Sequence, residues 1–129
     1  MILLDTDICI EILRKNEKVI KRRENTDEEI SISFITVGEL YYGAEKSTYA
    51  IENKKIIEEF LLTINVINSD NEIMMKFGEI KAELKTTNNQ LPDADLLIAA
   101  TTLTKTDKLV TGNIKHFERI KGLNIEKWI

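Results

Sequence analysis

A short apolar run that stops at carboxylates constrains the fold of this chain more than any other feature. Residues 2–4 are Ile-Leu-Leu without polar alternation, which is typical of a strand covered on both faces in a parallel sheet. Asp5, Thr6 and Asp7 follow at once. Ligands of open α/β sheets gather just beyond the carboxyl ends of the strands, but an Asp in this place also suits the N-cap of a helix. Asp5 is therefore predicted to be either a functional carboxylate or a helix cap.

The composition is that of one folded domain, residues 1–129. The chain is 43% hydrophobic and 31% charged, with one Pro and five Gly, which excludes low complexity and disorder. Cys9 is the only cysteine, which excludes an internal disulfide and a cysteine-rich metal site, and we expect it to be buried. No apolar stretch is long enough to span a membrane, so we expect no membrane contact and a cytoplasmic location.

Strand and helix patterns alternate along the chain. Strands are predicted at residues 2–4, 30–33, 66–67, 108–111 and 123–129, with Trp128 packed in the last. Helices are predicted at residues 6–15, in the basic run that follows, and at 34–46, 50–64, 71–85, from 93 onward and 114–120. This alternation predicts an α/β fold with a mostly parallel central sheet of four to five short strands and helices on both faces.

Glu39 is a carboxylate on an otherwise apolar helical stripe. Ile35 and Gly43 flank it one turn to either side, so it points toward the protein instead of into water. It also lies three residues after Thr36, which as an N-cap would make Glu39 part of a capping box. Glu39 is therefore predicted to be either a residue of a functional site or part of a helix cap.

Asp93 and Asp95 lie about 200° apart around a helix and cannot share a face. Asp93, after Pro92, is a natural N-cap, whereas Asp95 is left in the first turn of a helix that is apolar nearly all round. A charge in that place needs a cation or several donors as partners. Asp95 is therefore the better functional candidate of the two.

An oxygen-rich site is predicted where these elements converge. Asp5 and Asn113 each follow a strand, while Glu39 and Asp95 sit early in neighbouring helices. Three carboxylates and one amide, with no Cys or His cluster, suit Mg²⁺ or Mn²⁺ better than Zn²⁺. His116 is the only histidine, and its place near the chain end favours a surface or packing role.

A basic run contrasts with the net charge of −4. Its six cations are Arg14, Lys15, Lys18, Lys21, Arg22 and Arg23. Two explanations fit this run: a solvated helix face, or a patch that steers a phosphate backbone.

The segments LLDTD, ITVGELYYGA, PDADLLIAA and LVTGNIKHF begin at residues 3, 35, 92 and 109. In sequence, order and spacing they resemble the four motifs of PIN-domain ribonucleases, and most closely those of the VapC toxins of prokaryotic toxin–antitoxin pairs. The resemblance implies a PIN-like three-layer fold and an endoribonuclease that uses Mg²⁺ or Mn²⁺. It also implies a substrate such as tRNA or another structured RNA, and a cognate antitoxin protein that blocks cleavage. Homodimers are common among such proteins.

By position, the family's three acidic metal-site residues correspond to Asp5, Glu39 and Asp95. Asp7 and Thr111 match supporting positions, and Thr6, Thr111 and Asn113 would orient water or phosphate in catalysis. Under the same resemblance, the cations of the basic run would bind RNA. Many members of the family place a further acid at or near residue 113, whereas an amide ligates weakly and without charge. This departure puts a tightly held second metal in doubt.

Two other functions fit parts of this pattern. Receiver domains of response regulators share the length, the alternating fold and an acidic Mg²⁺ pocket, but residues 48–66 contain no Asp to accept a phosphoryl group. They also need a Lys after a late strand, whereas Lys108 begins one. A catalytically weak PIN domain that acts as an RNA- or protein-binding module is the stronger alternative, because Asn113 weakens the fourth motif.

Overall fold

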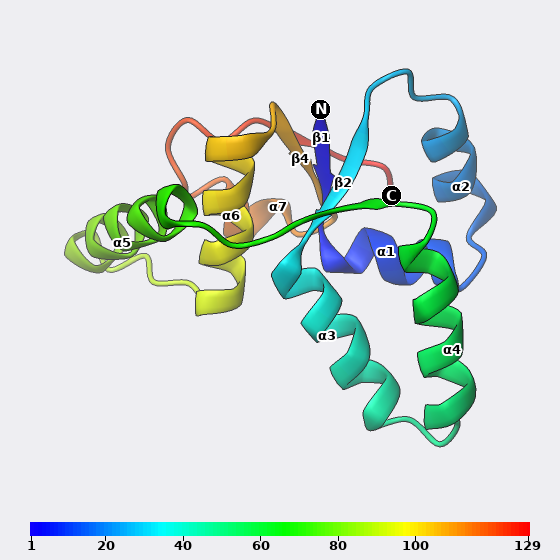
Figure 1. Ribbon diagram of the computed structural model, residues 1–129. Helices are drawn as coiled ribbons and strands as arrows, with labels where there is room; N and C mark the ends of the chain where they lie inside the picture. Colours follow the sequence, from blue (N-terminus) through cyan, green and yellow to red (C-terminus); the bar gives the residue numbers. More distant parts are fainter.

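The computed structural model describes all 129 residues and confirms the predicted α/β fold, with every strand of the central sheet parallel to its neighbours (Figure 1). The strands are β1 (Ile2–Leu4), β2 (Ile30–Ser33), β3 (Asn65–Ile67), β4 (Lys108–Val110) and β5 (Ile125–Glu126). Their order across the sheet is β3-β2-β1-β4-β5. β1 therefore lies in the middle, which explains why its apolar run has no polar alternation.

Seven helices connect and cover the strands. They are α1 (Thr6–Leu13), α2 (Glu17–Glu24), α3 (Phe34–Glu45), α4 (Ala50–Leu61), α5 (Asn71–Thr86), α6 (Asp93–Lys105) and α7 (Ile114–Phe117). α1 ends two residues earlier than predicted, because Lys15 takes a left-handed backbone conformation with φ of 62°. Asn16 then caps α2, and its side chain accepts hydrogen bonds from two backbone N–H groups of the first turn.

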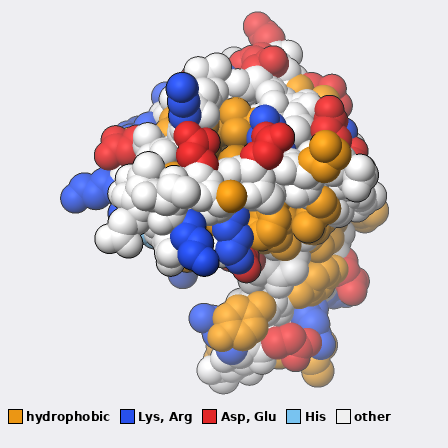
Figure 2. Space-filling model, turned by 90° about the vertical axis from the view of Figure 1, so that its left-hand side faces the viewer, with side chains coloured by type: hydrophobic (Ala, Val, Ile, Leu, Met, Phe, Trp, Pro, Cys, Tyr) orange, Lys and Arg blue, Asp and Glu red, His pale blue; other side chains and the backbone are white.

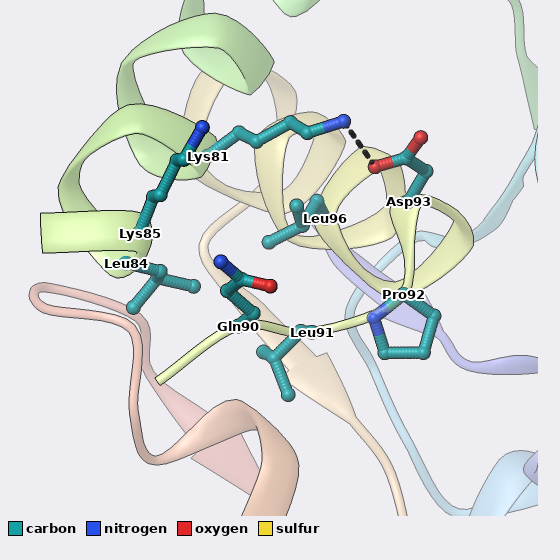
Figure 3. Close-up of a pocket in the computed structure, with 8 residues that line it drawn as sticks. All are labelled: Lys81, Leu84, Lys85, Gln90, Leu91, Pro92, Asp93 and Leu96. Atoms are coloured by element: carbon teal, nitrogen blue, oxygen red, sulfur yellow. Dashed lines mark hydrogen bonds and ion pairs between the residues drawn. The ribbon is translucent and has the colours of Figure 1, made fainter. Parts of the chain in front are cut away.

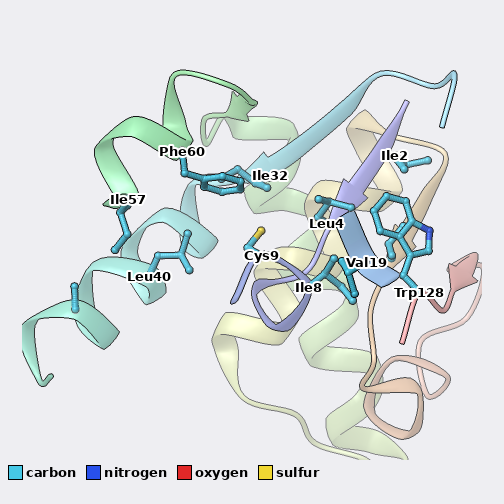
Figure 4. Packing of buried hydrophobic residues seen from close by; sticks show 12 residues of the cluster. Ile2, Leu4, Ile8, Cys9, Val19, Ile32, Leu40, Ile57, Phe60 and Trp128 are labelled. Carbon is cyan, nitrogen blue, oxygen red and sulfur yellow. The ribbon is translucent and has the colours of Figure 1, made fainter. Parts of the chain in front are cut away.

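The two faces of the sheet carry separate hydrophobic cores. Ile2 and Leu4 contact the core beneath α1–α4, whereas Leu3 contacts the core beneath α5–α7. Figure 1 shows α5 and α6 on one side of the sheet and α1–α4 on the other, and Figure 4 shows the core on the α1–α4 side. Cys9 and Trp128 are both buried in this core, as the sequence predicted. No helix of the structure is long and apolar enough to cross a bilayer.

Two predicted helix caps are wrong. α3 begins directly at the end of β2, so Ser33 is its N-cap and its hydroxyl accepts a hydrogen bond from Ile35 N at 3.2 Å. Thr36 is then inside the helix and buried, and no capping box with Glu39 forms. Pro92 takes the N-cap position of α6, which makes Asp93 the first helical residue.

Three predicted ends also shift. α7 stops at Phe117 instead of Ile120, since the backbone N–H of Ile120 bonds to Phe117 O in a turn. α4 stops at Leu61, before the predicted Ile64, because the backbone N–H and the hydroxyl of Thr63 both bond to Phe60 O. β5 covers only Ile125–Glu126 of the predicted 123–129, since it lies at the sheet edge and has one neighbouring strand.

The register of the central strands brings their carboxyl ends together. Leu4 is level with Ile32 on β2 and with Val110 on β4. Asp5, the first residue after β1, therefore lies beside the start of α3 and beside Thr111. Its backbone N–H donates a hydrogen bond to Val110 O at 2.9 Å. Polar residues that are far apart in the sequence thus meet at one edge of the sheet.

Candidate active site

Asp5 is held at the carboxyl edge of the sheet by two fixed donors. As the N-cap of α1, its Oδ1 accepts a hydrogen bond from Thr6 N at 2.7 Å. Its Oδ2 accepts one from Thr111 Oγ1 at 2.7 Å, and this hydroxyl in turn accepts from Asn113 N at 2.9 Å. Asp5 is only 6% exposed. The predicted role of Asp5 as a helix cap is therefore confirmed, and the side chain lies where the strands end, the position on which the second prediction, a functional carboxylate, depends.

Asp7 adds a second carboxylate close to Asp5. Its Oδ2 accepts a hydrogen bond from Gly112 N at 2.9 Å, whereas its Oδ1 is buried and has no partner. Burial raises the pKa of Asp5 to about 7, and the negative charge of Asp7 acts in the same direction against the hydrogen bond from Thr111. Burial also raises the pKa of Asp7. This part of the site is thus an anionic cluster in which a proton or a cation is favoured.

Glu39 reaches the same edge from α3. Its Oε1 accepts a hydrogen bond from Thr6 Oγ1 at 2.6 Å, and Thr6 Oγ1 also lies 3.0 Å from Thr36 Oγ1. A hydroxyl carries a single proton, so Thr36 donates to Thr6 while Thr6 donates to Glu39. Thr6 therefore links α1 to α3 and orients the Glu39 carboxylate.

Asp95 meets a residue that the sequence did not single out for the site. From the first turn of α6, its Oδ2 lies 3.0 Å from His116 Nδ1, and Asn113 Nδ2 lies 2.9 Å from the same nitrogen. The prediction of a surface or packing role for His116 missed this contact. The spacing could have indicated this contact. In a helix that begins after Asn113, His116 lies three residues later and therefore on the same face as Asn113.

The structure thus brings one set of predicted residues together at the carboxyl edge: Asp5, Thr6, Asp7, Glu39, Asp95, Thr111 and Asn113. It does not bring the whole basic run there. Arg23 donates to Thr63 O, before β3 begins, and its guanidinium lies 5.6 Å from the Phe60 ring centroid. Arg22 contacts Glu126 and lies 5.9 Å from the Trp128 ring centroid.

Arg14 is the cation of the run that shares a groove with one carboxylate of the acidic edge, Glu39. It lines a groove of about 580 Å³ between α1, α3 and α4, and Thr6 and Glu39 stand in the wall of the same groove. The remaining wall is largely apolar, with Ile10 from α1 and Ile56 from α4 among its residues. Figure 2 shows hydrophobic side chains exposed on the projecting α3–α4 hairpin and in a band above it.

Asp93 belongs to a different hollow. Its Oδ1 accepts a hydrogen bond from Lys81 Nζ at 2.9 Å, and both residues line a pocket of about 360 Å³ between α5 and the start of α6 (Figure 3). Lys85 and Gln90 line the same pocket (Figure 3). Asp93 has no hydrogen bond to any residue of the acidic edge, so it is a neighbour of Asp95 in sequence without a place in the site.

The donor set of the acidic edge fits a hard cation, although no ready-made cage is present. No three acidic, histidine or cysteine side chains lie close enough to hold one ion as a group. The oxygens of Asp5, Glu39 and Asp95 are nevertheless of the type that Mg²⁺ and Mn²⁺ prefer. Mg²⁺ commonly keeps several waters and takes only one or two carboxylates directly. The buried, unpartnered Oδ1 of Asp7 further shows that this region carries more acceptors than the chain has donors for.

The fold and the acidic edge together define a PIN domain, and a model of this domain matches residues 2–123. Ribonuclease VapC2 of Haemophilus influenzae is 37% identical over 128 residues, which cover 98% of this chain and 97% of that one. The tRNA(fMet)-specific endonuclease VapC of Salmonella typhimurium is 35% identical over 127 residues, which cover 98% and 96%. A chain in the crystal structure of VapBC2 from Rickettsia felis bound to a DNA fragment from their promoter has a TM-score of 0.93 and 32% identity, with full coverage of both chains. The chain therefore belongs to the VapC ribonucleases of the PIN-domain family.

Proposed function

We propose that this ribonuclease is a toxin that cleaves tRNA or another structured RNA with the help of Mg²⁺ or Mn²⁺. The observation that carries the proposal is the position of Asp5, Glu39 and Asp95. They come from three different elements at the carboxyl edge of the sheet, and each is oriented by its own hydrogen-bond donor or ring. Such pre-oriented carboxylates are what a metal-dependent nuclease requires.

Each residue of the edge has a separate task in this mechanism. Asp5 and Asp95 would bind the ion directly, and Glu39 would do so directly or through a water that it orients. When bound, a divalent ion supplies positive charge to the scissile phosphate and acidity to a coordinated water. Thr111 holds Asp5 and is itself held by Asn113 N, so these two residues keep the first carboxylate in place. Cleavage by water would leave a 5′-phosphate and a 3′-hydroxyl.

RNA binding near the site is proposed first for Arg14. Its groove adjoins Glu39, so its guanidinium is placed to contact a phosphate of a strand that enters the acidic edge. Lys15, Lys18 and Lys21 are exposed and add attraction over a longer range. Arg22 and Arg23 are occupied by the contacts described above and contribute less.

An antitoxin of the VapB kind would act through the same groove. Its apolar wall gives a partner segment area to bury, and the segment would then pass Thr6 and Glu39 and exclude RNA from the acidic edge. Ile56→Asp should therefore weaken binding of the cognate antitoxin, measured by titration calorimetry. Ile51→Asp is the matched control, because Ile51 lies on the same helix and is 80% exposed outside the groove.

One experiment separates cleavage from simple binding. The purified chain is incubated with total tRNA in Mn²⁺ and in EDTA, and the ends of the products are mapped. Cleavage in Mn²⁺ alone supports the proposal. RNA binding without cleavage in either condition would favour the catalytically weak binding module, for which Asn113 is the supporting observation, because its amide stands where the family often has an acid.

A further inference from the structure

Asp95 differs from the other two predicted metal-binding carboxylates in how it is held. Asp5 has a backbone donor and a threonine hydroxyl, and Glu39 has the Thr6 hydroxyl. Asp95 has one hydrogen-bond partner, the Nδ1 of His116 at 3.0 Å. Its side chain is 20% exposed and sits in the first turn of α6, where nothing else fixes the orientation of the carboxylate.

The hydrogen bonds around His116 select one arrangement of its ring. If Nδ1 lacked a proton, its lone pair would face a carboxylate oxygen 3.0 Å away, which is repulsive. With the proton on Nδ1, the ring donates to Asp95 Oδ2. Asn113 Nδ2, placed 2.9 Å from Nδ1, is itself a donor, so this tautomer requires the oxygen and nitrogen of the Asn113 amide to exchange places. After this exchange, both neighbours accept from the Nδ1 proton.

His116 is not needed to anchor its own helix. Phe117, the next residue, is fully buried and fixes α7 to the core under α5–α7. The His116 side chain is 38% exposed, so its ring adds little buried area. What the ring does contribute is the contact from α7 to the Asp95 carboxylate on α6.

We propose that His116 is a positioning residue for the metal site. It donates from Nδ1 to Asp95 Oδ2 and so presents the other oxygen, Oδ1, to a divalent ion. This inference rests on the proposed metal-dependent function. Residues that orient a metal-binding side chain in this way change metal affinity by about 10–100-fold when they are removed.

The test is Mn²⁺ affinity, measured by titration calorimetry in the absence of RNA. His116→Ala should bind Mn²⁺ about 10–100-fold more weakly than the wild type. His116→Asn keeps an N–H donor at the position of Nδ1, and it should recover most of the affinity. Lys115→Ala is the matched control from the same helix, because Lys115 is exposed, and it should bind like the wild type.

Each outcome decides the inference. Equal Mn²⁺ affinity of His116→Ala and wild type, both folded by circular dichroism, overturns it. So does a His116→Asn variant that binds as weakly as His116→Ala, because a donor alone would then not suffice. A wild type that binds no Mn²⁺ also overturns it. The proposed function fails separately, if the wild type cleaves no RNA while its metal affinity follows the pattern expected here.

Discussion

Two parts of the acidic edge, here called its buried half and its open half, differ in how their carboxylates are held. Asp5 and Asp7 form a buried half, held by backbone N–H groups and a threonine hydroxyl at the end of the central strand. Asp95 and His116 form an open half, in which both side chains are partly exposed and depend on each other. The buried half is shaped by the sheet itself, whereas the open half is shaped by two helix starts.

This difference has an energetic consequence. Burial and the charge of Asp7 raise the pKa of Asp5 to about 7, so the charged form of the buried half is costly without a cation. Water can reach the open half and stabilise its charge. Under the proposed mechanism, the buried half would supply most of the electrostatic attraction for a divalent ion, and the partly exposed half would adjust to ion and substrate.

The largest expected effect is on cleavage by Asp5→Asn. Asn keeps the shape and still caps α1, but it lacks the charge that would bind the ion. Loss of an orienting neighbour of a metal ligand costs about 10–100-fold, so loss of the ligand itself should cost at least about 100-fold in the cleavage rate. Initial rates with a labelled tRNA in Mn²⁺ measure this. A rate within a few-fold of the wild type would remove Asp5 from the metal site.

The second prediction concerns stability and pH in the absence of metal. The pKa of Asp5 rises from 3.8 in an unfolded chain to about 7 in the fold. Between these values the unfolded chain releases the proton and the folded chain keeps it, so stability falls as pH rises through this window and then levels off. The shift corresponds to roughly 4 kcal/mol at most, and relaxation should leave a net effect of about 1–2 kcal/mol.

Asp5→Asn should therefore be more stable than the wild type at pH 8 in EDTA and should lose most of this pH dependence. Mn²⁺ at about 100 times its dissociation constant should add roughly 2.7 kcal/mol to the wild type and little to the variant. Thermal melts at pH 5 and pH 8, with EDTA and with Mn²⁺, measure both effects. An Asp5→Asn protein less stable than the wild type at pH 8 would show that Asp5 contributes as a structural cap alone.

The smallest expected effect is on RNA affinity. Arg14→Ala should weaken binding and lower the slope of log affinity against log salt by about 1, because one fewer counterion is released. A variant with Lys18→Ala and Lys21→Ala should change the slope less, since α2 lies away from the acidic edge (Figure 1). Binding is measured by fluorescence anisotropy in EDTA, which prevents cleavage. A larger change in slope for the Lys18→Ala, Lys21→Ala variant than for Arg14→Ala would indicate that the RNA binds over α2.

Local patterns in the sequence were sufficient to predict the sheet and the buried half of the site. The unbroken apolar run of β1 predicted a parallel strand covered on both faces, and the carboxylates at its end predicted the acidic edge. The fold then follows from alternation, because parallel strands place all their carboxyl ends on one side.

The open half was harder to predict because it depends on how the helices begin. Ser33 competes with Thr36 as the cap of α3, and the sequence shows both as suitable hydroxyls. Asp93 bonds to Lys81 on α5, a tertiary contact that sequence spacing does not reveal. His116 contacts Asp95 only because α7 packs beside α6, and a single histidine in the sequence does not predict this packing.

Asp93 and Asp95 offer the most direct test of the central claim, that RNA cleavage depends on the carboxylates at the carboxyl edge of the sheet. They lie two residues apart on one helix, yet only Asp95 faces the site. Cleavage of tRNA in Mn²⁺ is measured for Asp95→Asn and Asp93→Asn side by side, with folding checked by circular dichroism. We expect Asp95→Asn to lose at least about 100-fold in rate, as expected for loss of a metal ligand, while Asp93→Asn keeps nearly full activity. An inactive Asp93→Asn protein beside an active Asp95→Asn protein would contradict the account.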